Sequence, residues 1–271
     1  MVLPILYHFA YSTCSQKVRM ALAEKGQQFE SREINLLAGE QHNPDYVRLN
    51  PDHVVPTMVR GDEVMTESSL INDYIDDAFD GAALRSVDPI ARYRAASIIH
   101  HVDNKLHGKV TGVFAHGVVT RAIVGARPPE AVEAYLNAIP DPAERKLRTS
   151  LIKHGTDAPE MPPAVDTMVA FFARMEALLE KQAWLSGDSF GLADICVAPY
   201  AVRFDEMGFV AFWNQGFAPR VERWIARMRA RPSFDVAFTR WMPEATAATF
   251  KTLGEAVCPR IEPLIRRAQG R

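Results

Sequence analysis

Over the first eighty residues, the pattern of hydrophobic and polar positions switches between strand and helix spacing. Residues 3–9 form an apolar run with the length of a strand, and residues 15–25 repeat apolar side chains at helical spacing before Gly26. Residues 29–36 alternate loosely between apolar and polar side chains, which is typical of a strand. The pattern therefore predicts a strand, a helix and a second strand.

The next stretch predicts a hairpin followed by a helix. Gly61-Asp62 suits a tight turn with positive φ, and the apolar runs beside it are residues 57–60 and 63–66. Residues 68–79 place their large apolar side chains on one face, and we expect Ser68 or Ser69 to be the N-cap. The whole order, βαβ and then ββα, predicts an α/β domain.

Beyond residue 90 the chain has helical spacing throughout. The polar, glycine-bearing segment 81–90 ends near an Asp-Pro pair and predicts a linker, so we expect one domain over residues 1–80 and an all-α bundle over residues 91–271. Residues 155–163, rich in Gly and Pro, predict a surface loop. The expected helices are residues 90–114, 129–138, 141–154, 163–182, 193–207, 219–230 and a last one from about 244.

Composition narrows the class of protein further. The 271 residues carry a formal charge of −2, which offers no electrostatic footprint for nucleic acid or an anionic membrane. The three cysteines have no CxxC spacing, so we expect neither a disulfide framework nor a zinc site and infer a reducing compartment. No stretch approaches the ~20 apolar residues of a membrane span. These features predict a soluble, cytoplasmic protein.

Three short motifs in the first domain carry candidate chemistry. Cys14 and its neighbouring hydroxyls lie where a helix begins, and backbone N–H groups there stabilise a thiolate or another anion. Pro56 suits an edge position or a cis turn, and a cis bond would leave the backbone of Val55 available to a peptide-like ligand. Glu67-Ser68 offers a carboxylate and a hydroxyl suited to an amino-acid head group.

The order of these motifs resembles the thioredoxin-fold domain of the cytosolic glutathione transferases. The resemblance rests on residues 12–19 (STCSQKVR), Asn50-Pro51, Val55-Pro56-Thr57 and residues 66–69 (TESS). Downstream, residues 190–195 (FGLADI) resemble the family's N-capping box, with Gly191 where the family usually carries Ser or Thr. The resemblance implies a thioredoxin-like glutathione-binding domain, then a helical acceptor-substrate domain with an extra C-terminal helix, and glutathione as cosubstrate.

The resemblance also implies roles for individual residues. Ser12 would donate a hydrogen bond to the glutathione sulfur, although Tyr7 and Tyr11 keep the family's tyrosine-type alternative open. The S-x-C spacing of Ser12 and Cys14 resembles the zeta class and the related reductive dehalogenases. In those dehalogenases the cysteine resolves a mixed disulfide with glutathione, and the resemblance implies the same role for Cys14. The alternative is that Cys14 is a buried, inert thiol. The residues implied to bind glutathione are Gln41 or His42 at the glycyl end, Val55 and Pro56 at the cysteinyl unit, and Glu67 and Ser68 at the γ-glutamyl end.

The second domain resembles a more particular group. Residues 135–200 look like the bacterial glutathione-dependent β-aryl etherases of lignin breakdown. The function this implies is attack of glutathione thiolate on a hydrophobic, aromatic electrophile, including β-aryl ether cleavage. The alternatives are a glutathione-dependent dehalogenase or maleylacetoacetate-type cis-trans isomerase, and a non-catalytic glutathione-fold binding protein. Family likeness further implies a homodimer, or a heterodimer with a related chain.

Several further side chains are candidates for the acceptor pocket, for a metal site or for a solvated surface. Phe9 and Tyr11 lie beside Ser12 in sequence and are expected to line the pocket, together with His100 and Asn104. His100, Asp103 and His107 share a helix face, but no fourth ligand is evident and we expect no metal site. Two further predictions concern surfaces: a solvated basic face at Arg220, Arg223, Arg227 and Arg231, and a last helix over residues 250–271 that closes the active site.

Overall fold

The computed structural model describes residues 3–271, which form two compact units. The first unit takes in the chain up to Asp103, together with Leu178–Arg203 and Arg223–Glu244. The second unit consists of Asn104–Ala177, Phe204–Glu222 and Ala245–Arg271. The units therefore interleave along the chain, and the division at residues 81–90 stays a prediction.

A four-stranded mixed sheet lies in the first unit, with strand order β2-β1-β3-β4. β1 is parallel to β2 and antiparallel to β3, with Leu6 opposite Met58 in the register. Both of these side chains are fully buried, whereas all of β2 is exposed at the sheet edge. The strands are β1 (Ile5–His8), β2 (Glu30–Glu33), β3 (Thr57–Arg60) and β4 (Glu63–Met65). Every predicted strand is present: β3 has the predicted bounds, and the other three strands are shorter than predicted.

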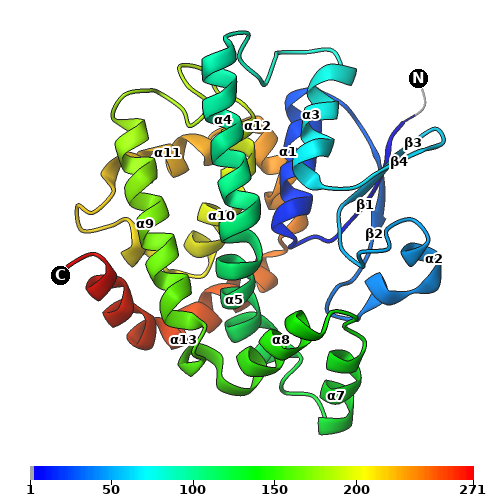
Figure 1. The fold of residues 1–271 in the computed structure, drawn as a ribbon, viewed down its shortest axis with the longest axis vertical. Helices are drawn as coiled ribbons and strands as arrows, with labels where there is room; N and C mark the ends of the chain where they lie inside the picture. Colours follow the sequence, from blue (N-terminus) through cyan, green and yellow to red (C-terminus); the bar gives the residue numbers. More distant parts are fainter. Residues whose placement is uncertain (1–2) are drawn as a thin grey trace. The chain divides into compact units, whose positions relative to one another are not determined.

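Two helices of the first unit pack side by side against one face of the sheet, α1 (Thr13–Glu24) and α3 (Ser68–Ala78), while the short α2 (Pro44–Val47) lies on the other side (Figure 1). α1 buries Val18, Ala21 and Leu22 completely, as its spacing predicts. The predicted N-cap of α3 is wrong: the cap is Glu67, whose side chain makes no capping hydrogen bond.

Helices make up the rest of the chain, and most begin where the sequence indicates. Pro89 starts α4 behind the N-cap Asp88, whose carboxylate accepts from Ala91 N at 2.8 Å. Short 3₁₀ segments connect several helices: η1 (Glu40–His42), η4 (Gly155–Asp157), η5 (Val210–Phe212) and η6 (Thr239–Trp241). The longer helices are α4 (Pro89–His101), α7 (Pro129–Asn137), α8 (Pro142–His154), α9 (Met161–Leu179), α10 (Leu192–Glu206), α11 (Pro219–Arg229), α12 (Pro232–Ala237) and α13 (Glu244–Ala268).

The helix predicted over residues 90–114 is longer than expected and partly π-helical. Helical backbone continues from Pro89 through α5 (Gly112–Phe114) to the end of α6 (Arg121–Ile123). Between these pieces lie two π-helical segments, η2 (Val102–Thr111) and η3 (Ala115–Thr120). π-helical turns are rare and concentrate at functional sites. Because they repeat with a longer period, α-helical spacing does not predict which of their residues share a face.

The start of α10 explains the glycine that departs from the family pattern. A Cβ at Gly191 would lie 2.3 Å from the carbonyl oxygen of Leu84, so only glycine fits there. The hydroxyl that the cap lacks comes from Ser186, whose Oγ accepts from Ala193 N at 3.0 Å. Asp194 keeps its half of the box by accepting from Gly191 N at 3.2 Å and from the Trp224 indole at 2.8 Å.

Of the expectations about surfaces, the loop over residues 155–163 is wrong in part and the basic face holds in part. The segment predicted as a surface loop buries Gly155 and Ala158, because it packs closely against η3: a Cβ at Gly117 would lie 3.3 Å from the Gly155 carbonyl oxygen. On the predicted basic face near α11, Arg223 and Arg227 are exposed as expected, whereas Arg220 and Arg231 are partly buried in ion pairs. Arg220 pairs with Glu176 at 2.9 Å, and Arg231 binds both carboxylate oxygens of Glu24.

Candidate active site

The loop between β1 and α1 holds Ser12 in a defined geometry. Ser12 is the N-cap of α1, and its Oγ accepts a hydrogen bond from Ser15 N at 3.2 Å. A hydroxyl has one proton to donate and two lone pairs, so accepting this bond leaves its proton for another partner. Phe9 O in turn accepts from Ser12 N at 3.1 Å, which closes the turn. The arrangement suits donation to an anion at the start of the helix.

Cys14 lies in the first turn of α1 and is partly exposed. One turn further along the same helix, Lys17 is completely buried and its ammonium contacts Asp103 Oδ1 at 2.7 Å. The pKa of Lys17 lies well above its usual value. Burial alone would lower this pKa, but the acidic groups around the ammonium raise it by more than burial lowers it; these groups are Tyr200, Cys14, Cys196 and Asp103. Cys14 therefore lies within the field of a buried cation.

The loop before β3 carries a cis peptide bond between Val55 and Pro56, one of the two alternatives that the sequence left open. Asn50 holds this loop: its side-chain N–H groups donate to Val54 O at 2.9 Å and to Thr57 Oγ1 at 3.0 Å. Tyr46 also donates to Val54 O. Within residues 3–271 the backbone of Val55 makes no hydrogen bond, so its N–H and C=O are available to a ligand.

The Ser12 and Val55 loops meet in a small apolar cluster. Phe9, Tyr46 and Val55 form its buried centre, and Tyr7 and Tyr11 pack against it. Phe9 is only 8% exposed, and its ring packs edge-on against Tyr11 with centroids 5.1 Å apart. Its place in the acceptor pocket stays a prediction. Tyr11 remains half-buried beside Ser12.

Glu67 and Ser68 stand at the N-terminus of α3. Glu67 is exposed and has φ 64°, a left-handed conformation that a residue with a side chain seldom adopts. Such backbone strain of about 1–3 kcal/mol concentrates at ligand sites. Because no side chain caps this helix, its first N–H groups can bind a carboxylate.

Gln41 and His42 begin a chain of hydrogen bonds to a second histidine that the sequence did not single out. Gln41 Nε2 donates to His42 Nε2 at 3.1 Å, so the His42 proton sits on Nδ1 and points to His53 Nδ1 at 3.0 Å. Gln41 is 4% exposed, and its Oε1 has no partner in the described chain. A donor on a ligand would satisfy that oxygen.

The other predicted residues have different surroundings. His100 and Asn104 are exposed, one in each compact unit, and their acceptor role stays a prediction. Asp103 accepts from Lys17, which occupies one member of the candidate metal triplet. Among residues 3–271, no group of three or more His, Cys, Asp or Glu side chains could hold a metal ion, and no helix has the length and apolar character to cross a bilayer.

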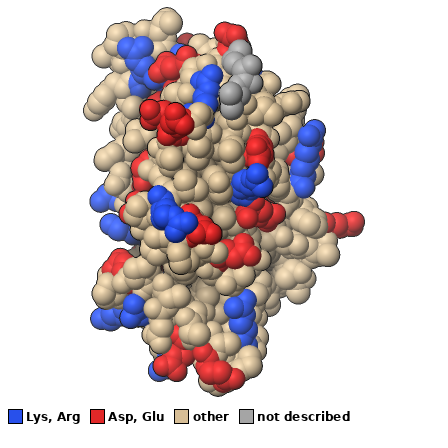
Figure 2. All heavy atoms as spheres, turned by 90° about the vertical axis from the view of Figure 1, so that its right-hand side faces the viewer, with Lys and Arg blue, Asp and Glu red and all other residues tan. Residues whose placement is uncertain are grey.

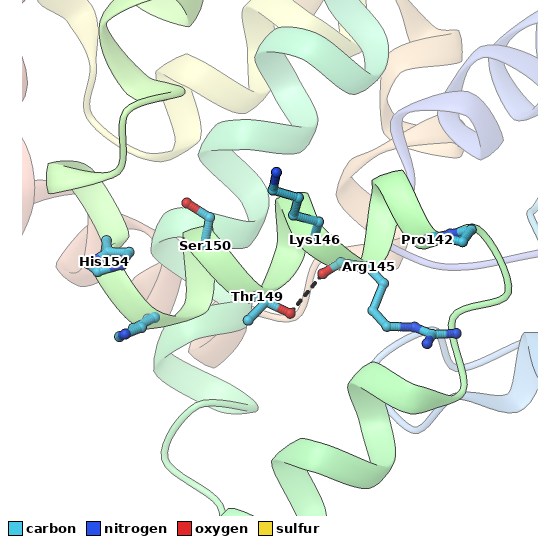
Figure 3. Close-up of a pocket in the computed structure, with 7 residues that line it drawn as sticks. Pro142, Arg145, Lys146, Thr149, Ser150 and His154 are labelled. Carbon is cyan, nitrogen blue, oxygen red and sulfur yellow. Dashed lines mark hydrogen bonds between the residues drawn. The ribbon is translucent and has the colours of Figure 1, made fainter.

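Surface features elsewhere involve none of the predicted site residues. An open depression of about 500 Å³ follows one face of α8, where Thr149 donates to Arg145 O at 2.8 Å (Figure 3). Its lining residues are Pro142, Arg145, Lys146, Thr149, Ser150, Lys153 and His154. The face drawn in Figure 2 intersperses positive and negative side chains, without a broad area of one sign.

Comparison with known proteins decides the family. The chain matches "Glutathione S-transferase, N-terminal domain" over residues 6–83 and "Glutathione S-transferase, C-terminal domain" over residues 129–227. The chain belongs to the glutathione S-transferase family. This transferase is therefore an enzyme whose cosubstrate is glutathione, and the alternative of a non-catalytic binding protein is disfavoured.

Three relatives of this transferase carry informative names. Protein LigF of a Sphingobium species is 30% identical over 87% of this chain and 93% of LigF, and the crystal structure of this β-etherase matches 88% of this chain and all of its own, with a TM-score of 0.80 and 27% identity. The tetrachloro-p-hydroquinone reductive dehalogenase of Sphingobium chlorophenolicum is 28% identical over 88% of this chain and 96% of its own. A maleylacetoacetate isomerase of Pseudomonas aeruginosa is 28% identical over 90% and 99%.

Proposed function

We propose that this transferase activates glutathione for attack on an aromatic electrophile, and that its reaction is β-aryl ether cleavage. The extent of the likeness to the β-etherase LigF, in sequence and in fold, supports this substrate class. The observation that carries the catalytic assignment is Ser12 at the start of α1, with its oxygen bonded to Ser15 N and its proton left to donate.

Activation of glutathione requires that the pKa of its thiol be lowered. A free thiol with a pKa of ~8.5 is only a few per cent thiolate at neutral pH. Lowering this pKa by about two units requires ~2.7 kcal/mol of differential stabilisation, at ~1.36 kcal/mol per unit. A hydroxyl donor and the N–H groups of the first helical turn both favour the charged sulfur, and together they are of the right order.

The remaining contacts orient the tripeptide. The backbone of Val55, beside the cis bond to Pro56, pairs with the cysteinyl unit, and the uncapped N-terminus of α3 binds the γ-glutamyl carboxylate near Ser68. Glu67 meets the γ-glutamyl ammonium. Gln41, with its unpartnered oxygen, or His42 meets the glycyl end.

In the reaction, the thiolate sulfur attacks the carbon that bears the ether oxygen. A carbon–sulfur bond forms as the carbon–oxygen bond breaks, and the bonding electron pair leaves with the phenolate oxygen, which takes a proton from solvent. No net oxidation or reduction occurs, so the reaction needs no reactant besides glutathione and the ether.

Ser12→Ala tests the assignment. The ultraviolet absorbance of the thiolate, followed against pH, should show the thiol pKa of bound glutathione rising by about one unit or more, with a matching loss of kcat at neutral pH. Ser150→Ala is the matched control, since this hydroxyl donates to Glu160 in the second unit and should leave the thiol pKa unchanged. An unchanged thiol pKa in Ser12→Ala contradicts the assignment.

A second candidate function rests on Cys14 beside the buried ammonium of Lys17. In reductive dehalogenation, glutathione first displaces halide from the ring. The Cys14 thiolate then attacks the sulfur of the conjugate, the ring carbon leaves with the electron pair and takes a proton, and a second glutathione reduces the mixed disulfide. Cys14→Ser should abolish dehalogenation of a chlorohydroquinone and accumulate the glutathionyl conjugate, while ether cleavage continues. Loss of both activities would argue against separate roles.

Three further predictions belong to the same proposal. A role in lignin breakdown follows from the substrate class, a cytoplasmic location from the odd cysteine count, and a dimer from family likeness. Light scattering coupled to size-exclusion chromatography measures the assembly directly, and a mass near 30.3 kDa would exclude a stable dimer.

A further inference from the structure

Two buried arginines donate hydrogen bonds to three successive backbone carbonyls immediately before Ser12. Arg19 of α1 donates through Nη1 to Phe9 O at 3.2 Å and through Nη2 to Ala10 O at 2.8 Å. Arg203 of α10 donates through Nη2 to Tyr11 O at 2.8 Å, across 192 positions of sequence. All the carbonyls from Phe9 to Tyr11 are thus held by guanidinium groups.

Neither arginine can easily change its direction. Arg19 is completely buried, and its Nε also donates to Ala237 O at 2.8 Å while its guanidinium lies over the Trp241 ring. Arg203 is 6% exposed. A guanidinium is a planar fork whose donors point in fixed directions, so it fixes the carbonyls it binds. A peptide that rotates in this loop would move the N-cap with it.

Stability alone is a poor reason for this arrangement. Burial disfavours the charged form and lowers the pKa of Arg19, Glu33 partly opposes this, and the positive charge of Arg203 lowers it again. Two like charges held close together in a buried region cost free energy that apolar side chains would not. In return for this cost, the Phe9–Tyr11 loop is held in one conformation beside Ser12, the residue assigned to the glutathione sulfur.

We propose that Arg203 is a positioning residue for glutathione activation, which together with Arg19 holds the Phe9–Tyr11 carbonyls so that the Ser12 hydroxyl stays directed at the glutathione sulfur. The inference rests on the proposed function of Ser12. Arg203 itself acts through the loop and not by touching the sulfur.

The test compares Arg203→Met with Arg203→Lys. Arg203→Met should raise the thiol pKa of bound glutathione by about one unit, a tenfold loss of thiolate below the pKa, and kcat should recover at high pH where the thiol ionises unaided. Arg203→Lys keeps the charge and one donor but lacks the fork, and about a threefold loss is expected. KM for glutathione should change less than kcat. Arg148→Met, which removes a half-buried arginine bound to Glu144 and Tyr135 in the second unit, is the control and should leave the thiol pKa unchanged.

A double-mutant cycle distinguishes action of Arg203 through Ser12 from a direct effect of the Arg203 charge on the sulfur. If Arg203 acts through Ser12, Arg203→Met has no further effect on the thiol pKa in the Ser12→Ala background. A full, additive shift there would mean that the charge acts on sulfur directly and overturns the positioning role. If Ser12→Ala raises the thiol pKa and Arg203→Met does not, only this inference fails; if Ser12→Ala has no effect, the proposed function fails. Where Arg203→Met does not fold, judged by circular dichroism, Arg203→Lys carries the same cycle.

Discussion

Mild acid should loosen this fold through His8, the last residue of β1. The ring is completely buried, its Nδ1 accepts from Arg19 Nη1 at 3.0 Å, and its Nε2 proton therefore points to Ser31 Oγ at 2.8 Å. Burial, and then the charge of Arg19, lower the pKa of His8 to about 3. In the unfolded chain the same ring has a pKa of ~6.5.

The sign of the effect follows from which state binds the proton first. As the pH falls below ~6.5 the unfolded chain takes up a proton that the folded protein refuses, so the free energy of unfolding is constant at higher pH and decreases down to about pH 3. At pH 5 the loss is 1.5 units at ~1.36 kcal/mol each, or about 2 kcal/mol. His116, whose pKa is also lowered well below its usual value by burial, adds a loss of the same sign.

Urea unfolding followed by tryptophan fluorescence at pH 7.5, 6.5, 5.5 and 5.0 measures this loss. The decisive quantity is the difference between the parent protein and His8→Gln, in which the His8 share of about 2 kcal/mol between pH 7.5 and 5 should disappear even though the variant is less stable overall. Equal pH dependence in the parent and in His8→Gln would refute the reasoning.

Three further predictions concern the cap of α10 and the start of α3. Gly191→Ala should lower the free energy of unfolding by about 2–3 kcal/mol, because its Cβ meets the Leu84 carbonyl; a loss below 0.5 kcal/mol in urea would contradict this. Asp194→Ala leaves buried donors without an acceptor and should cost about 3 kcal/mol or more, measured in the same way. Glu67→Gly should raise the thermal midpoint by relieving about 1 kcal/mol of strain, yet raise KM for glutathione; an unchanged KM would argue against a contact with glutathione.

Local patterns were enough to predict the elements that carry the candidate site. The apolar run before Ser12, the helical spacing after it and the Gly61 turn each express a short-range preference, and the corresponding strands and helices are present. The Val55-Pro56 motif likewise signals its own turn. Membership of the glutathione S-transferase family agrees with the order of these motifs.

Contacts between distant segments could not be predicted in this way. The bond from Arg203 to Tyr11 joins residues 192 positions apart, and arginine in a helix carries no signal of its partner. Ser186 replaces the missing cap hydroxyl from a loop, and Leu84 excludes a side chain at Gly191, both only because the chain folds back on itself. All residues of strand β2 are exposed, so its sequence has little apolar periodicity, and the predicted range 29–36 is longer than the strand Glu30–Glu33.

The two π-helical segments η2 and η3 give the long helix a tolerance for changes of length. A π-helical turn holds one residue more than an α-helical turn, because its hydrogen bonds run from i to i+5. A residue inserted or deleted within Val102–Thr111 can therefore be absorbed by widening or narrowing the turn, while α4 before it keeps its place. Asn104, a predicted acceptor residue, lies in this segment. Relatives that differ here by one residue would present a different set of side chains between unchanged ends, so a gap in an alignment at this point can be a change of specificity.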